Sequence, residues 1–439
     1  MINWLLKTLD FNKVIFDTSI LSTNISLCLK TSLIANLFVL MVVFLYIITT
    51  IYSIGYLTFE RDKRKPRFHI LTALSVLTTI CLAYSNNLFT AFIFYDLLSV
   101  CTYMLVKHHG DEESEKHALI YALYLLIPSM LFLLPAIIIV YNIAEHTDFV
   151  VGGILSQHPI SKSYVNIIFL MFMYGISKTA LYPLHKWLIH AMVAPSPVSA
   201  LLHAVLVVKG GLFLLYKVIV ETFGLEFLQQ NIYTISNIPF PVYIAGFGII
   251  MAGVSAIASD NIKQRLAYST ISQIGYISMC FFCFTKESIF AGQMQFLAHS
   301  FAKISLFYYA GYLLARYHTT KISELKFERN HFNIVLSILW IIPTLSLMSM
   351  PFTAGFISKH AIVGGTIHSL PDIKFFILIF VGMLLCILYL YPILYHLISF
   401  NNHIKRFTGQ YFSTFCVYFS VSVVSICIIL SFFILNNVF

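Results

Sequence analysis

Charged side chains lie inside segments that otherwise have the composition of membrane-spanning helices. Four of them are lysines and one is an aspartate: Lys178, Lys209, Lys303, Lys359 and Asp96. A charged side chain at bilayer depth costs about 2.5–3.5 kcal/mol on insertion scales. Groups at that depth that can gain or lose a proton are therefore candidates for moving protons or ions.

Two histidines accompany these lysines. His299 and Lys303 are four residues apart, so they share one helix face, where a water can bridge them or a proton can pass between them. His203 and Lys209 are six residues apart and are expected on different faces of one helix, without direct contact. The plainer alternatives are a packing role for His203 and snorkelling of Lys209 or Lys359 to the membrane interface.

An acid and a base from different segments are expected to pair. Asp96 lies near the middle of its apolar segment, and Lys178 is its natural partner between helices. The carboxylate would hold the ammonium charged, and its loss would let desolvation favour the neutral amine. The pair is therefore predicted to act as a switchable acid.

Two of the charged segments contain residues that break helices. Pro183 follows Lys178 by five residues and should interrupt that helix, because proline removes a backbone hydrogen bond. Pro351 and Gly355 interrupt a second segment just before Lys359. Interrupted helices at corresponding positions of two halves indicate an ion site in transporters that are built from repeats.

The elements that carry these residues are predicted to be membrane helices. Of the 439 residues, 59% are apolar and 10% charged, whereas soluble domains average roughly 45–50% and 25%. Apolar runs recur from Ser32 onwards, and each is long enough to cross a hydrocarbon core of roughly 30 Å. We predict about twelve spans, near 33–56, 68–84, 87–107, 117–142, 164–183, 196–218, 240–257, 262–284, 288–315, 333–366, 374–398 and 412–435.

The expected fold class is all-α: a polytopic membrane protein of about twelve transmembrane helices, built from two inverted five-helix repeats that each contain a broken helix. Residues 1–31 are predicted to form an N-terminal amphipathic entry segment with an interfacial helix. A leading transmembrane helix and basic loop follow at 32–67, the two halves at 68–225 and 226–400, and a C-terminal transmembrane helix at 401–439.

Basic residues collect in alternate loops, which are predicted to lie on the cytoplasmic side. The net charge of +9 follows from this topology, and nucleic-acid binding is not expected. The eight cysteines are expected to pack as small apolar residues. The Cys280–Cys283 pair, spaced as CxxC, keeps a redox or metal site as its alternative.

Five strings resemble, in order, landmarks of the proton-conducting antiporter-like family of membrane subunits. They are IYSIGYL at 51–57, SKTALYPLHKWLIHAMVAPSPVSALLHAVLVVKGG at 177–211, IKQRLAYSTISQIGY at 262–276, HSFAKISLF at 299–307 and MPFTAGFISKHAI at 350–362. The family includes NADH dehydrogenase subunits 5 and 4 of respiratory complex I and Mrp-type cation/proton antiporter subunits. The chain is most similar to subunit 5, over about residues 32–400.

The resemblance implies a role for each charged residue. Asp96 stands where the family usually has a glutamate paired with the broken-helix lysine, which is Lys178 here. Lys209 matches the lysine that connects the halves, and the central relay and terminal lysine fall on His299, Lys303 and Lys359. The aspartate is one methylene shorter than glutamate, and the family's two leading helices and its lateral helix are not expected in this chain.

The predicted function is that of a proton-translocating subunit of an NADH:quinone oxidoreductase-like (complex I) assembly. The proton relay would comprise Asp96, Lys178, Lys209, His203, His299, Lys303 and Lys359. No cofactor, metal or redox centre is expected in this chain. The expected partners are other membrane subunits, the lipid bilayer, protons and Na⁺, in a bacterial or mitochondrial inner membrane.

Two alternatives stay open at this point. One is a subunit of a Mrp-type monovalent cation/proton antiporter, which the neighbouring subunits would distinguish. The other is a degenerate paralogue with a structural role.

Overall fold

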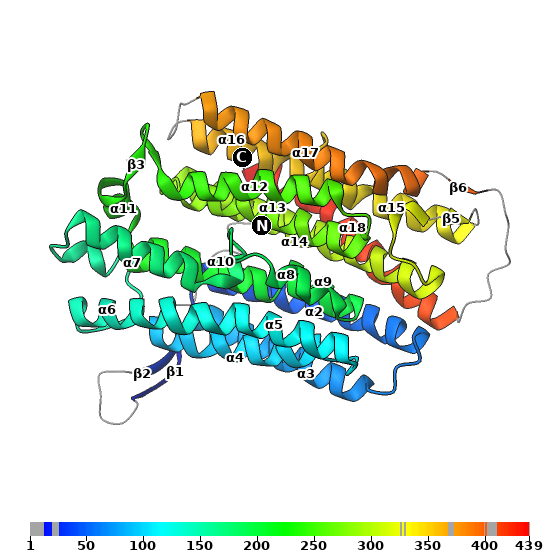
Figure 1. Ribbon diagram of the computed structural model, residues 1–439, viewed down its shortest axis with the longest axis horizontal. Coiled ribbons are helices and arrows are strands. Elements are labelled where there is room, and N and C mark those ends of the chain that lie inside the picture. The colour runs from blue at the N-terminus through cyan, green and yellow to red at the C-terminus, as the bar shows by residue number, and fades with distance from the viewer. Residues whose placement is uncertain are drawn as a thin grey trace. The chain divides into compact units, whose positions relative to one another are not determined.

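The computed structural model describes residues 13–19, 26–324, 327–328, 331–367, 373–398, 400–401 and 411–438, and helices dominate it (Figure 1). The helices up to the middle of the chain are α2 (Leu33–Phe59), α3 (Lys65–Tyr84), α4 (Leu88–Val106), α5 (Glu112–Pro128), α6 (Leu134–Ala144), α7 (Lys162–Gly175), α8 (Trp187–His190), α9 (Ser196–Ala204), α10 (Val207–Lys217) and α11 (Leu225–Asn231). The later ones are α12 (Phe240–Ala258), α13 (Ile262–Phe281), α14 (Lys286–Tyr317), α15 (His331–Leu347), α16 (Ala354–Ile367), α17 (Ile373–Ile398) and α18 (Tyr411–Val438).

Short 3-10 and π segments interrupt or extend these helices. The 3-10 segments are η2 (Leu155–Gln157), η3 (Ser177–Thr179), η4 (Ala191–Val193) and η6 (Ile322–Glu324), and the π segments are η1 (Ser129–Leu133) and η5 (Val218–Phe223). Segments of this kind inside helices often mark functional positions.

Eight helical stretches of the described residues are long and apolar enough to cross a membrane. They are Leu33–Phe59, Lys65–Tyr84, Leu88–Val106, Glu112–Ala144, Ser196–Phe223, Phe240–Ala258, Phe375–Ile398 and Thr414–Leu435. Helices suit these runs because lipid offers the backbone no hydrogen-bonding partner, so N–H and C=O groups must pair within the segment. The all-α, polytopic fold class is confirmed, while the count of twelve and the inverted repeats stay predictions.

The outer faces of the helices are apolar. Large side chains such as Leu77, Leu131, Phe380 and Phe415 are each more than half exposed. Water would oppose this arrangement, whereas lipid tails accommodate it. The chain is therefore an integral membrane protein.

The described part of the entry segment is not the interfacial helix that the sequence predicts. Strand β1 (Val14–Ser19) pairs antiparallel with β2 (Ser26–Lys30). The β-branched and aromatic residues of VIFDTS favour an extended backbone. The second strand is anchored to α4, because the Thr90 hydroxyl accepts from the Cys28 amide at 3.1 Å; the remaining residues of 1–31 lie outside the described part.

Two further pairs of short strands are present among the described residues. Strands β3 (Thr234–Ile235) and β4 (Ile238–Pro239) form an antiparallel pair just before α12. Strands β5 (Phe327–Glu328) and β6 (Phe400–Asn401) pair in parallel. The other connections within the described residues are turns and loops.

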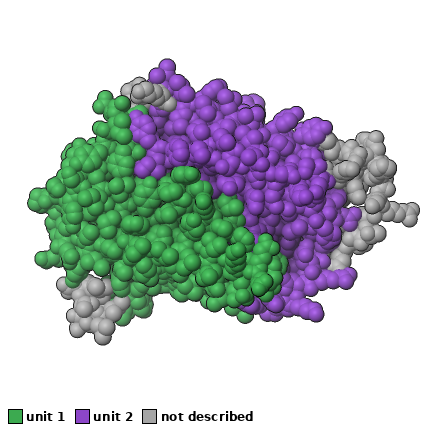
Figure 2. Space-filling view, viewed as in Figure 1, with its two compact units in different colours: residues 1–46, 68–190, 205–240 green, residues 47–67, 191–204, 241–439 purple. Residues whose placement is uncertain are grey.

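The chain divides into two compact units, coloured green and purple in Figure 2. Unit 1 comprises residues 1–46, 68–190 and 205–240, and unit 2 comprises residues 47–67, 191–204 and 241–439. In unit 1, α4 packs against α5, α10 packs against η3, and α7 packs against η1 and α6. In unit 2, the 32-residue helix α14 is the common neighbour of α9, α13, α15, α16 and α18.

The first interrupted helix breaks before its proline. Helix α7 ends at Gly175, the 3-10 turn η3 follows, and Pro183 lies in the non-helical segment beyond it. Gly175 fits there because a side chain would collide with the backbone of Leu133 in η1. The Lys178 amide then donates to the Tyr95 hydroxyl at 3.0 Å, which replaces the hydrogen bond that a continuing helix would supply.

The second interruption lies between α15 and α16. Pro351 sits in the gap, and Gly355 lies in the first turn of α16. A Cβ atom at Gly355 would overlap the carbonyl oxygen of Ser346, so the two helix ends approach each other more closely than a side chain permits. Lys359 follows one turn later in α16.

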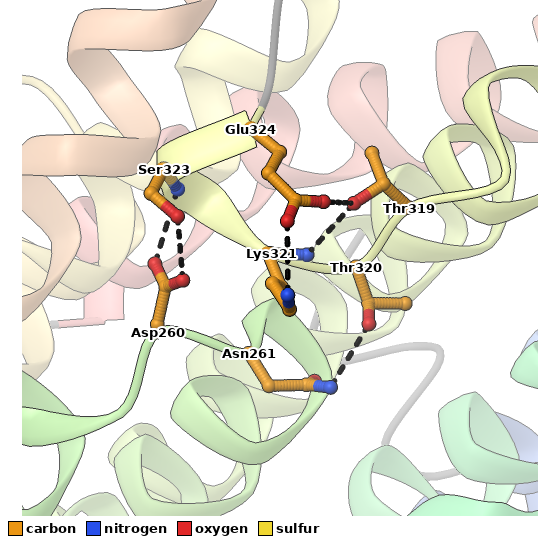
Figure 3. Close-up of polar contacts among 7 residues, drawn as sticks. All are labelled: Asp260, Asn261, Thr319, Thr320, Lys321, Ser323 and Glu324. Carbon is orange, nitrogen blue, oxygen red and sulfur yellow. Dashed lines mark hydrogen bonds and ion pairs between the residues drawn. The ribbon is translucent and has the colours of Figure 1, made fainter.

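A polar cluster ties the α12–α13 turn to the segment after α14 (Figure 3). The Asp260 carboxylate accepts hydrogen bonds from the Ser323 amide at 3.0 Å and hydroxyl at 2.7 Å. These hydrogen bonds hold the pKa of Asp260 below its usual range. Asn261 caps α13 by accepting from the Lys263 amide at 2.9 Å, so the turn also fixes where α13 begins.

Candidate functional site

Lys178 occupies the 3-10 turn η3 of unit 1 and is fully buried. Its Nζ donates to the Tyr95 carbonyl at 2.7 Å and to the Ser99 hydroxyl at 2.6 Å, both on α4. The same nitrogen faces the Tyr95 ring at 3.1 Å from the centroid, where the negative face of the ring attracts a cation. Uncharged groups therefore replace the water that a buried ammonium loses.

Several elements fix the turn that carries Lys178. The Trp187 indole of α8 donates to the Ser177 carbonyl at 3.0 Å. From the other direction, α10 approaches so closely that a Cβ atom at Gly211 would lie 2.7 Å from the Lys178 Cβ. The lysine arm is therefore placed by packing rather than by a regular helix.

Asp96 and Lys178 make no direct ion pair in the described structure, although their charges act on each other at longer range. Both Asp96 carboxylate oxygens instead accept from the Ser129 hydroxyl, at 2.8 and 3.0 Å. Because successive helical residues are rotated by about 100°, the lysine meets the α4 face of Tyr95 and Ser99, and Asp96 projects elsewhere. Ser129 lies in the π segment η1, and sequence reasoning missed it because it looks like one polar residue in an apolar run.

Unit 1 contains another buried lysine that sequence reasoning missed. The Lys217 ammonium donates to the Ser85 carbonyl at 2.5 Å and pairs with Glu221 at 3.8 Å. The i,i+4 spacing of Lys217 and Glu221 was visible in the sequence as a signal of pairing. This lysine has a carboxylate within ion-pairing distance, whereas Asp96 acts on Lys178 only at longer range.

His203 and Lys209 are not on one continuous helix. Helix α9 ends at Ala204, and α10 begins at Val207. Lys209 is fully buried in unit 1, whereas His203 belongs to unit 2, where its ring packs against Phe307 at 4.8 Å between centroids. Both ring nitrogens of His203 are buried without a protein hydrogen bond in the described structure, and buried imidazoles of this kind commonly bind water.

Lys303 of α14 is fully buried in unit 2 and repeats the coordination seen at Lys178. Its Nζ donates to the Leu266 carbonyl at 2.9 Å and to the Ser269 hydroxyl at 2.7 Å, both on α13. His299 is fully buried one turn earlier on the same helix. The bridge between His299 and Lys303 stays a prediction.

Lys359 of α16 is buried against α13. Its Nζ lies 2.8 Å from the centroid of the Tyr276 ring. Within the described residues this nitrogen makes no hydrogen bond. An aromatic face is a weaker ligand for an ammonium than a carboxylate, so this site stabilises charge less than an ion pair would.

The serines that bind Lys178 and Lys303 were also missed by sequence reasoning. Ser99 follows Tyr95 by four residues, and Ser269 follows Leu266 by three. In each pair the serine hydroxyl and the backbone carbonyl that accept from the lysine therefore share a helix face. A serine three or four residues from any position is too common in membrane helices to stand out. Only the packing against a lysine gives it a role.

Neutral oxygen ligands suit a lysine that changes its charge. A buried lysine that pairs with a carboxylate leaves that carboxylate unpaired when it loses its proton, which is costly in a dry interior. At Lys178 and Lys303 the ligands are a carbonyl and a hydroxyl, and a neutral amine can keep hydrogen bonds to both. The arrangement can therefore hold either protonation state.

The described part of the chain bears on the metal and redox alternatives for its cysteines and histidines. No group of three or more histidine, cysteine or acidic residues is placed to hold a metal ion there. Cys280 and Cys283 are buried in α13 and at its end, and neither forms a disulfide in the described part. The Cys283 thiol donates to the Met279 carbonyl at 3.3 Å, which is a local helical contact.

Curated proteins similar to the chain are named as antiporter and oxidoreductase subunits. A protein of Staphylococcus saprophyticus named as antiporter subunit mnhA2 is 28% identical over 72% of this chain and 40% of its own length. NAD(P)H-quinone oxidoreductase subunit 5 from the chloroplast of Zygnema circumcarinatum is 26% identical over 74% of this chain and 46% of its own length. The chain thus spans less than half the length of these two relatives.

Solved structures share the fold at lower sequence identity. A chain of the Mrp complex from Dietzia sp. DQ12-45-1b superposes with a TM-score of 0.78 at 19% identity, covering 98% of this chain and 46% of its own length. A chain of the archaeal membrane-bound sulfane sulfur reductase superposes with a TM-score of 0.80 at 18% identity, covering 99% and 88%.

One family model matches more than half of the chain. Residues 85–388 match one family, and this range contains every charged residue assigned to the predicted relay. We conclude that the chain belongs to the family of NADH:quinone oxidoreductase/Mrp antiporter transmembrane subunits.

Proposed function

We propose that this chain is a proton-translocating membrane subunit of an NADH:quinone oxidoreductase-like assembly. Protons would move along buried lysines and histidines, in which Lys178 and Lys303 change charge. The observation that carries the proposal is their shared coordination by a backbone carbonyl and a serine hydroxyl, with no carboxylate in direct contact in the described structure. Such ligands tolerate both protonation states.

The other residues of the predicted relay would assist proton movement near Lys178 and Lys303. Lys359 lies against an aromatic ring, and His203 is a buried imidazole whose nitrogens can bind water. The Asp96 carboxylate accepts a hydrogen bond from Ser129, and its charge would act on Lys178 over a longer distance. Lys209 is buried within the same unit as Lys178. Redox chemistry and the driving force would come from partner subunits of the assembly.

A Mrp-type cation/proton antiporter subunit is the second candidate. It is favoured by the relative named as an antiporter subunit, which shares 28% identity with this chain. The same buried lysines would serve either assembly. Isolation of the native complex separates the two, because redox subunits or antiporter subunits would copurify.

The proposal is tested by measuring proton and sodium flux in vesicles that contain the assembled complex. The Lys178→Ala variant is expected to abolish proton flux while the complex still assembles. Lys217→Ala is the matched control, since Lys217 is also a buried lysine of unit 1 but already has a carboxylate partner. Unchanged proton flux in Lys178→Ala would favour a structural paralogue instead.

A further inference from the structure

Two histidines of unit 1 that lie outside the predicted relay are in direct contact. The Nδ1 atoms of His117 on α5 and His190 on α8 are 2.7 Å apart, which is a hydrogen-bonding distance. The ring centroids are 4.9 Å apart, and the Tyr124 ring of α5 also stacks on His190, at 6.5 Å between centroids. Both histidines are only partly buried, so water has access to them.

The protonation state of this pair decides whether its hydrogen bond can exist. A neutral imidazole carries one N–H donor and one acceptor nitrogen, whereas an imidazolium carries two donors and no acceptor. Two neutral rings, or one neutral and one protonated ring, can therefore share an N–H···N hydrogen bond between the Nδ1 atoms. Two protonated rings would instead point two N–H groups and two positive charges at each other. The contact thus opens when the second proton binds.

The surroundings of the pair disfavour the second proton. The charged and titratable groups on the elements packed here are Glu113, Lys116 and Tyr124 of α5, His185 and Lys186 just before α8, Lys178 of η3, and the Lys107–Glu115 ion pair at the α4–α5 turn. Glu113 lies one turn before His117, whereas residues 180–194 contain Lys186 and no acid. Burial, together with the charges of His117 and Lys186, holds the pKa of His190 below its usual range. The contact is therefore intact at neutral pH and opens as the pH falls below about 6.5.

Helix α8 connects this pair to the turn that carries Lys178. It is four residues long and begins at Trp187, so contacts to α5 must hold it in place. The Trp187 indole donates to the Ser177 carbonyl at 3.0 Å, and Ser177 immediately precedes Lys178. From α5, the Tyr121 ring packs edge-on against Trp187 at 5.7 Å between centroids. Direct contacts and neighbouring residues thus lead from His190 to Lys178.

We propose that the His117–His190 contact positions α8 and the Lys178 turn, and that it opens when both imidazoles are protonated. The two histidines are positioning residues, because they act on Lys178 through Trp187 and Ser177. Opening would release α8 from α5 and displace the lysine from its ligands, so proton translocation in unit 1 becomes sensitive to pH. This inference rests on the proposed function, because it concerns the placement of the same lysine.

The test replaces one titratable partner with an amide. Asparagine places a polar atom on Cγ where histidine has Nδ1, and an amide can either accept from or donate to His117. In His190→Asn the contact therefore survives in every protonation state of His117, whereas in His190→Ala it is absent at every pH. His109→Asn is the matched control, because His109 is an exposed histidine of the neighbouring α4–α5 turn.

Driven proton flux is measured in vesicles that contain the assembled complex, at pH values about 1 unit above and about 1.5 units below the ordinary histidine pKa of about 6.5. We expect the native complex and His109→Asn to lose flux about tenfold at the lower pH, because displacing a reacting group lowers its rate. His190→Asn should keep most of its flux there, and His190→Ala should be low at both pH values. A native pH profile in His190→Asn would overturn the proposal.

Amide hydrogen exchange of residues 177–190 in the assembled complex reports local opening without requiring proton flux. After correction for the intrinsic pH dependence of exchange, this segment should exchange faster at the lower pH in the native chain but not in His190→Asn. Equal protection of the native segment at both pH values would overturn the proposal, whatever the flux. Absence of driven flux in the native complex at the higher pH, together with the expected exchange, would count against the proposed function alone.

Discussion

Gly211 offers a direct way to displace Lys178 without changing it. In Gly211→Ala the new Cβ would lie 2.7 Å from the Lys178 Cβ, 2.8 Å from its carbonyl carbon and 2.9 Å from the Thr179 nitrogen. Carbon atoms in ordinary contact are about 3.5–4.0 Å apart, so the overlap is on the order of 1 Å. Two of these three atoms belong to the backbone, and the turn or α10 must therefore move.

The neighbouring Gly210 provides a matched control. In Gly210→Ala the new Cβ would meet only leucine methyl groups, at 3.3 Å from Leu82 and 3.5 Å from Leu98. Both substitutions replace a helical glycine of α10, and each gains about 1 kcal/mol of helix propensity. The difference between the two variants therefore isolates the overlap, which we expect to cost about 1–3 kcal/mol of stability.

The functional effect should be larger than the effect on stability. A displacement of about 1 Å at a reacting group can lower a rate on the order of 100-fold, and the hydrogen bonds of Lys178 to Tyr95 and Ser99 are only 2.7 and 2.6 Å long. We expect Gly211→Ala to lower proton flux in vesicles by 10- to 100-fold, with Gly210→Ala near native. Thermal unfolding in detergent reports stability. If Gly211→Ala and Gly210→Ala are equally stable and show equal proton flux, proton flux does not require this position of Lys178.

Three further predictions concern other positions. Ser129→Ala removes the hydroxyl that donates to Asp96, and because a hydrogen bond to a charged group contributes about 1.5–3 kcal/mol, proton flux in vesicles should fall about tenfold. A native proton flux in this variant would exclude a role for this contact. Gly355→Ala forces a methyl group onto the Ser346 carbonyl oxygen of α15, and we expect a lower melting temperature and a reduced proton flux. An unchanged melting temperature would contradict the close approach of the two helices. Hydrogen bonds from Ser323 lower the pKa of Asp260, so its stabilising effect is present above the ordinary carboxyl pKa and is lost as pH falls through the lowered pKa. In that pH range the melting temperature of Asp260→Asn should therefore depend less on pH than the melting temperature of the native chain.

The sequence was informative about composition, helices and buried charge, because these depend on local properties. Apolar runs long enough to cross lipid predict helices wherever they occur, and every predicted span overlaps a helix of the structure. Lysines within such runs were recognisable at once as unusual. Lys178, Lys303 and Lys359 are indeed almost completely buried.

The tertiary structure decided what those lysines contact. The sequence suggested an acidic partner for Lys178, because opposite charges are the strongest sequence signal for pairing. Packing instead placed Ser99 and a backbone carbonyl there, and it placed Ser129 at Asp96. A serine or an amide carries no charge and has no distinctive spacing, so its function arises only where neighbouring helices bring it to a lysine.

Helix packing also explains a contact between two buried amides and the position of the first helix break. Gln273 and Gln295 are 22 residues apart in sequence but meet at 2.8 Å because α13 and α14 pack side by side. The first break occurs at Gly175 and not at Pro183, since a close approach to η1 requires the glycine. Local sequence therefore determined which segments enter the membrane and where charge is buried, whereas helix packing determined which neutral groups surround that charge.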